Sequence, residues 1–175
     1  MADLTEELEA VFQDFPGLRQ YGVQARRAPS RGGPGRIEFF PPDEAHNPMP
    51  GTPLIEVYDE DLFGDELRRV LASEHMHYLP RVDPKFNELR ELLKTTMTPQ
   101  QREESRRRYN FYTNQGIENR PYDRWFDISD FDQFLGGYIS PPDNNEWEGA
   151  YTDKQRFIME AMKDLMRGGK NYGPR

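Results

Sequence analysis

The sequence predicts a single α+β domain over residues 1–175, mainly helical, with one small sheet formed by residues 36–40 and 53–58. A length of 175 residues is enough for one domain with a substantial core. Two short runs rich in β-branched and aromatic residues favour the sheet, and most of the remaining chain shows helical spacing of apolar residues. An aromatic content of 13% argues against a disordered chain, although only 35% of the residues are hydrophobic.

The N-terminal region predicts a short amphipathic helix over residues 3–14, because its apolar residues recur at helical spacing and Pro16-Gly17 follows. A second short helical piece is expected over residues 18–26. Residues 26–36 combine four arginines with glycine and proline and are predicted to form a flexible basic loop. These arginines could contact an acidic partner or a phosphate, but a solvated loop is the interpretation we favour.

Two strand-like runs come next. Residues 37–40 resemble a strand that Pro41-Pro42 ends, and residues 43–53 are expected to form an extended loop. Residues 54–58, with the sequence LIEVY, have the strongest strand character in the chain. The two runs therefore predict the small sheet.

The rest of the chain predicts helices with identifiable ends. One helix is expected over residues 65–79, ended by Pro80, and another over residues 84–94 with Asp83 as its N-cap. Thr98 and Thr152 each precede a glutamine by three residues, the pattern of a capping box, and each is expected to open a helix. Gly168-Gly169 ends the last helix, and residues 168–175 are predicted to form a frayed tail.

The charge and residue content exclude several classes of protein. A net charge of −8 argues against binding of nucleic acid through a general basic surface. The absence of cysteine excludes disulfides and thiolate metal sites. No apolar run approaches the roughly 18 residues of a membrane span, and the acidic start lacks the features of a signal peptide. We expect a soluble protein that is not secreted by the ordinary route.

The segment 73–77 reads Ser-Glu-His-Met-His, which is the zinc-peptidase pattern H-E-x-x-H with serine at the first position. Helical spacing of apolar residues predicts that Glu74 and His77 share the inward face of the helix, while His75 lies about 100° away. In a zinc hydrolase Glu74 would act as the base and His77 as a metal ligand, with His46 approaching from the upstream loop. Serine is a poor zinc ligand, so a structurally satisfied Glu–His pair is the interpretation we favour.

Residues 59–66 suggest a calcium loop at first sight. Phe63 and Val70 occupy two positions that would need oxygen ligands, so the pattern fails. These acids are expected to supply N-caps and first-turn charges for the following helix.

An aromatic cluster follows later in the chain and includes Tyr122, Trp125 and Phe126. Core packing accounts for most such clusters, but an exposed part of this one is predicted to bind a partner.

Several phrases together resemble an uncharacterised family of tailed-bacteriophage proteins, with a similarity that runs from about residue 5 to residue 167. These phrases are FPPDE at 40–44, NP-x-PG at 47–51, IEVYD at 55–59, HYLP-x-VDP-x-F at 77–86, MTPQQ at 97–101 and ENRPY-x-x-WF at 118–126. The resemblance implies a phage gene in or near the structural module. It implies no activity.

The function expected from these observations is that of a non-catalytic phage protein that binds other phage or host proteins. It would lie in the virion or in the host cytoplasm and need no cofactor. One alternative is a divergent zinc hydrolase that uses Glu74 and His77. Another is an acidic anti-defence inhibitor whose surface mimics nucleic acid for a basic host protein.

Overall fold

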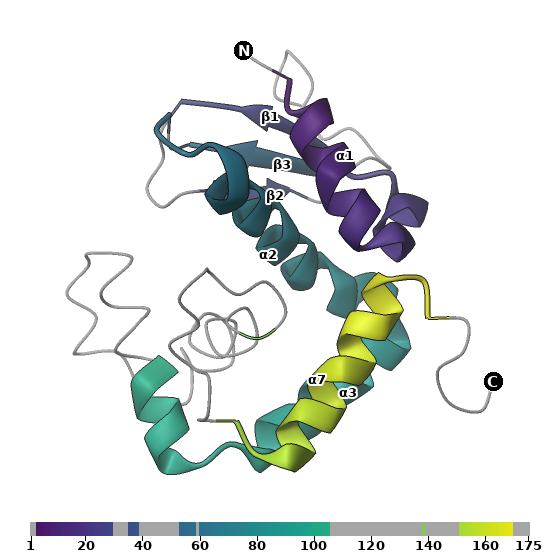
Figure 1. Cartoon of the computed structure of the whole chain (residues 1–175), viewed down its shortest axis with the longest axis vertical. Coiled ribbons are helices and arrows are strands. Elements are labelled where there is room, and N and C mark those ends of the chain that lie inside the picture. The colour runs from purple at the N-terminus through teal and green to yellow at the C-terminus, as the bar shows by residue number, and fades with distance from the viewer. Residues whose placement is uncertain are drawn as a thin grey trace.

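The computed structural model describes residues 3–29, 35–38, 53–58, 60–105, 138 and 151–169, and the side chains of 35–38 are not described. The fold is a single, mainly helical α+β domain with one small sheet, as the sequence predicted. Figure 1 shows α1 and α2 side by side against one face of the sheet, with α3 and α7 paired at the other end of the molecule. No helix within these ranges is long and apolar enough to cross a membrane.

The N-terminal helix α1 spans Thr5–Asp14 and confirms the predicted helix. The predicted helical piece over 18–26 is wrong in its second half. A 3-10 helix, η1, spans Pro16–Tyr21, and Gly22 ends it at a φ of +64°. Strand β1 follows at Gln24–Arg27. Its QARR sequence carries no strand signal, so the pairing with a neighbouring strand decides its conformation.

The sheet has three strands in the order β1-β3-β2. Strand β3, Leu54–Val57, is fully buried and lies in the centre, parallel to β1 and antiparallel to β2, Gly35–Glu38. The two predicted strands are therefore confirmed and a third joins them. The prediction of a flexible loop over 26–36 is wrong at both ends, because 26–27 belong to β1 and 35–36 to β2.

Helix α2 spans Gly64–Val82, and α3 spans Pro84–Thr96. The expected end of α2 at Pro80 is wrong, since Pro80 lies inside its last turn. A proline there removes only one backbone hydrogen bond near the helix end. The Asp83 carboxylate accepts from the backbone N–H groups of Lys85 and Phe86 at 3.0 and 3.1 Å, which confirms it as the N-cap of α3.

Both predicted capping boxes are present. The Thr98 hydroxyl accepts from the Gln101 N–H at 3.1 Å, and residues 99–105 are helical. The Thr152 box opens α7, Asp153–Met166. At the other end of α7, the Gly169 N–H donates to the Asp164 carbonyl and the Gly168 N–H to the Leu165 carbonyl, which is a Schellman motif. The predicted end of the last helix is confirmed; residues 170–175 of the predicted frayed tail lie outside the described residues.

The core runs through both ends of the molecule. Near the sheet it contains Leu18, Ile55, Leu67 and Leu71, all fully buried. In the other half α3 and α7 pack against each other through the buried side chains of Phe86, Leu93, Met159 and Met162. Helix α2 contacts α1 and α3 and so joins the two halves.

Candidate functional site

The structure reverses the predicted orientation of the α2 histidines. His75 is fully buried, Glu74 is half-buried and His77 is exposed, so the expectation that Glu74 and His77 share the inward face is wrong. The inward face follows a different line of four-residue steps: Leu67, Leu71, His75 and Leu79, flanked by Ala72 and Met76. Apolar Val70 and Tyr78 lie only half-buried beside this face.

His75 lies in an apolar environment between α1 and α2. Its Nδ1 is 2.8 Å from the Leu71 carbonyl oxygen, and its ring meets the ring of Phe12 edge to face at 5.8 Å. Burial lowers the pKa of His75 to about 4, and the bond to Leu71 offsets this only in part. The imidazole is therefore neutral at physiological pH, with its proton on Nδ1.

Glu74 is less buried than His75, His77 is exposed, and both Glu74 and His77 make further interactions. Within the described ranges, no three His, Asp or Glu side chains gather closely enough to hold a metal ion. His46, the third predicted ligand, lies outside those ranges. A zinc site on this helix would have to draw its remaining ligands from parts of the chain that the structure does not describe.

The acidic run before α2 supplies first-turn charges, as expected, from Asp65 and Glu66. The expected N-cap role is wrong for the described residues, because Phe63 occupies the N-cap and its side chain makes no capping bond. Asp65 instead pairs with Arg68 one turn later.

Two arginines of the predicted basic loop are committed to internal contacts. Arg26 donates to the buried carboxylate of Glu56, its register partner across β1 and β3, at 3.1 Å. Arg27 donates to the Leu62 carbonyl at 2.7 Å and stacks over the ring of Phe63 at 4.7 Å. Arg26 therefore links two strands of the sheet, and Arg27 fastens the sheet to the segment before α2.

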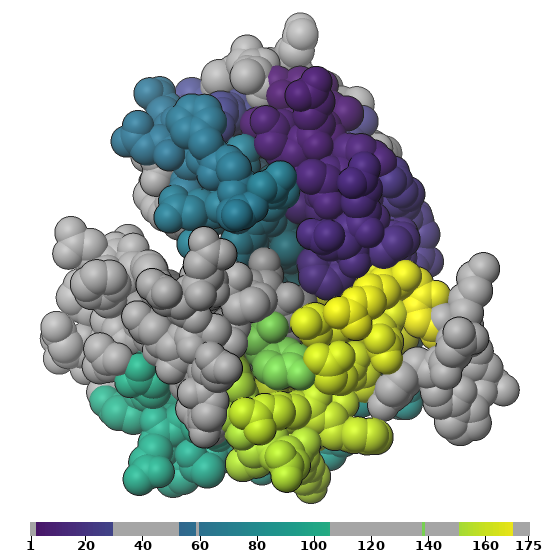
Figure 2. Space-filling model, viewed as in Figure 1, coloured from purple at the N-terminus to yellow at the C-terminus, as the bar shows by residue number. Residues whose placement is uncertain are grey.

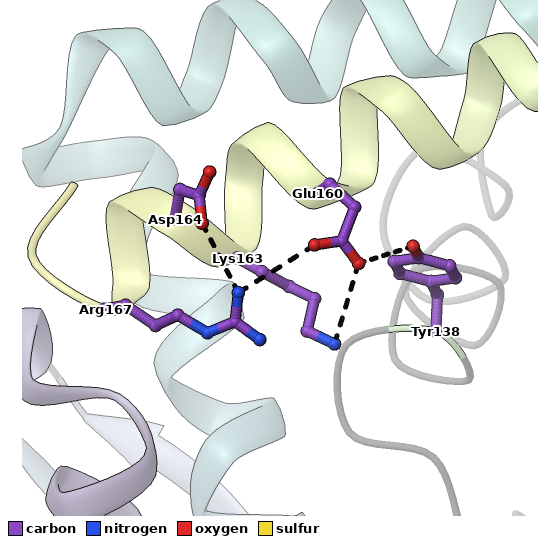
Figure 3. A network of polar contacts seen from close by, with 5 residues as sticks. All are labelled: Tyr138, Glu160, Lys163, Asp164 and Arg167. Carbon is purple, nitrogen blue, oxygen red and sulfur yellow. Dashed lines mark hydrogen bonds and ion pairs between the residues drawn. The ribbon is translucent and has the colours of Figure 1, made fainter. Parts of the chain in front are cut away.

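A polar network on α7 escaped the sequence analysis (Figure 3). The Tyr138 hydroxyl donates to Glu160 Oε1 at 2.6 Å, and Arg167 lies 3.8 Å from Glu160 Oε2 and 3.3 Å from Asp164. Lys163 lies 4.0 Å from Glu160 and faces the Tyr138 ring at 5.3 Å. The spacing of Glu160, Lys163 and Asp164 on α7, with Arg167 directly after it, was a signal for a shared helix face, but nothing in the sequence linked these residues to Tyr138.

The network changes the proton affinity of two of its members. Burial and the bond to Glu160 raise the pKa of Tyr138 to about 12. Burial lowers the pKa of Lys163, and the Glu160 carboxylate partly opposes that shift. The Tyr138 hydroxyl therefore keeps its proton at neutral pH and donates it to the hydrogen bond with Glu160.

Large apolar side chains also remain on the described surface. Phe157 on α7 is 70% exposed, Phe63 is 66% exposed and Leu92 on α3 is 45% exposed. Figure 2 shows α7 reaching the visible face of the molecule. The predicted partner-binding residues Tyr122, Trp125 and Phe126 lie outside the described residues.

No family model, curated protein or solved structure matches this chain.

Proposed function

We propose that this chain is a non-catalytic phage protein that acts by binding another protein, as a component of the virion. The observation that carries the proposal is the exposed ring of Phe157 on α7. The opposite face of this helix already buries Ile158, Met159 and Met162, so the fold does not require an aromatic residue at 157. Aromatic side chains of this kind are enriched at the centres of protein interfaces.

The surroundings of Phe157 support a binding role. Glu160, one turn along α7, is held by Tyr138, Lys163 and Arg167 (Figure 3). A surface whose side chains are already ordered loses less entropy on binding. The resemblance to tailed-phage proteins favours another protein of the phage particle as the partner.

The test replaces Phe157 by serine in the phage that carries the gene. We expect purified virions to contain the wild-type chain and to lose the variant, while the isolated variant keeps its melting temperature. The matched control is Lys154→Ala, an exposed substitution one turn earlier on α7. The virion proposal fails if the wild-type chain is missing from particles, and Phe157 is the wrong contact if the serine variant is packaged normally.

The zinc hydrolase remains the second candidate, because exposed His77 and half-buried Glu74 lie three residues apart on α2. Its test is the zinc content of the purified full-length chain and of His77→Ala. A stoichiometric metal that the variant loses would favour the hydrolase.

The anti-defence inhibitor is the third candidate. It draws on the residues up to Leu18, which include five acids and no lysine or arginine. Salt-sensitive binding to a basic host protein, in a chain that is absent from particles, would favour it.

A further inference from the structure

Strand β2 has an unpaired outer edge within the part of the chain that the structure describes. It is last in the order β1-β3-β2, its inner edge pairs with β3, and Figure 1 shows it at the border of the sheet. The opposite border, along β1, is already occupied, because Asp3 forms a bridge with Arg26 there. The Leu4 N–H also donates to the Ala25 carbonyl at 3.1 Å. Unpaired backbone groups along a sheet edge are a template for another strand.

The sequence of β2, Gly35–Glu38, is suited to pairing with a copy of itself. It contains no proline, and a β-branched isoleucine stands at position 37 between an arginine at 36 and a glutamate at 38. Positions 36 and 38 share one face of the strand, because successive residues of a strand alternate between its two faces. In a pair of antiparallel strands, opposite charges directly across from each other are stabilising and like charges are destabilising.

Symmetry limits the ways in which two β2 strands can pair. In an antiparallel pair, the N–H and C=O groups of every second residue point to the same edge. Two copies related by a two-fold axis must therefore meet with one residue of β2 opposite itself. Two such registers pair three residues of each strand. A register centred on Arg36 puts this arginine opposite its own copy, whereas one centred on Ile37 puts Arg36 opposite Glu38 of the second copy, twice.

We propose that two copies of this chain associate through the outer edges of their β2 strands, in the antiparallel register centred on Ile37. The interface then contains two Arg36–Glu38 pairs on one face and the two Ile37 positions on the other. The two three-stranded sheets become one sheet of six strands, a common size in globular proteins. This interface is separate from the exposed ring of Phe157 on α7, so it does not depend on the proposed function.

Sedimentation of the full-length chain over a range of concentrations measures this association. We expect the wild type to dimerise, and Glu38→Arg to dimerise roughly 30-fold more weakly, because it puts arginine opposite arginine at both pairs. Arg36→Glu puts acid opposite acid and should have the same effect. An equimolar mixture of the two variants restores both pairs of opposite charge and should associate as tightly as the wild type. The matched control Glu88→Arg makes the same charge change at an exposed position of α3 and should dimerise as the wild type does.

Three results would overturn the proposal. The first is a wild type that stays monomeric at about 1 mM, which would leave the edge of β2 to a strand of another protein. The second is a Glu38→Arg variant that dimerises as tightly as the wild type, since the interface would then lie elsewhere. The third is a mixture of the two variants that associates no better than either variant alone, which would mean that the register is wrong.

Arg36→Glu also brings a second acid into register with Glu56 of β3, so the melting temperature of this variant is measured as well. If the variant does not fold, hydrogen exchange of the wild type decides the matter. Amides of β2 that become more protected as the protein concentration rises, while those of α3 do not, would support the proposal. Exchange of the β2 amides that is independent of concentration would refute it.

Discussion

Tyr138 is tied to α7 by its hydroxyl group and by its ring, and the two contributions can be separated. The hydroxyl donates to Glu160 at 2.6 Å in an exposed position. The ring faces the Lys163 ammonium group and meets the Tyr151 ring edge to face at 5.3 Å. Water can form a hydrogen bond with Glu160 when the hydroxyl is removed, but it cannot replace the contacts of the ring. We therefore expect the ring to contribute more than the hydroxyl group to the free energy of unfolding.

Substitutions at Tyr138 test this division. Tyr138→Phe keeps the ring and should lower the free energy of unfolding by about 0.5–1 kcal/mol. Tyr138→Ala also removes the ring contacts and should cost roughly 1–2 kcal/mol more. Urea unfolding at pH 7 gives both values. Equal losses in the two variants would show that the hydroxyl group, and not the ring, holds Tyr138 against α7.

At the scale of elements, the starts of two helices are joined through their capping glutamines. Gln101 donates from Nε2 to Gln155 Oε1 at 2.9 Å, and Gln155 donates back to Gln101 Oε1 at 2.8 Å. Each Oε1 also accepts the backbone N–H of its own capping threonine, Thr98 or Thr152. Both glutamines are buried, so these bonds form where water cannot replace them.

Gln155→Glu separates the capping bond from the pairing. A carboxylate still accepts the Thr152 N–H, but it loses the donors to Gln101 and to the Thr96 carbonyl at 3.2 Å and buries a charge. We expect a loss of about 1–3 kcal/mol at pH 7. The loss relative to wild type should shrink at pH 5, because a protonated glutamate can donate again. Thr152→Ser, which keeps a capping hydroxyl, is the control. A Gln155→Glu variant as stable as this control would show that the bonds between Gln101 and Gln155 add no measurable stability.

The capping boxes also show which contacts can be predicted from the sequence. Both were predictable, because each is a contact between residues three positions apart, and the end of α7 at Gly168 was predictable for the same reason. The pairing of Gln101 with Gln155 was not, since 54 residues separate them. Local chemistry fixes a helix end, whereas contacts between distant residues depend on the assembled fold.

The candidate site was predicted less well, for a related reason. Helix α2 has enough apolar residues to support two different inward faces, and the sequence favoured the one with Glu74 and His77. Packing against α1 selected the other face, with His75 opposite Phe12. Strand β1 was missed because Arg26 and Arg27 have a loop-like sequence, and only pairing with β3 makes them a strand.

At the scale of the whole molecule, Gly17 forms a close contact between the two halves. It lies in η1 against the C-terminal end of α7, where the chain turns at Gly168 with a φ of +92°. A β-carbon at position 17 would lie 2.5 Å from the Gly168 nitrogen and 2.7 Å from the Leu165 carbonyl oxygen. These are backbone atoms of the motif that ends α7, so they cannot rotate away as a side chain could.

Gly17→Ala should therefore force the two halves apart and lower the free energy of unfolding by about 1–3 kcal/mol, a typical cost of overpacking. We expect hydrogen exchange to increase in η1 and in the last turn of α7 together, because both elements form the contact. Gly22→Ala is the matched control, since nothing lies within 4 Å of its added carbon and only the strain of its positive φ remains. A Gly17 variant that loosens η1 and leaves α7 protected would show that the two halves are held together elsewhere, through α2 alone.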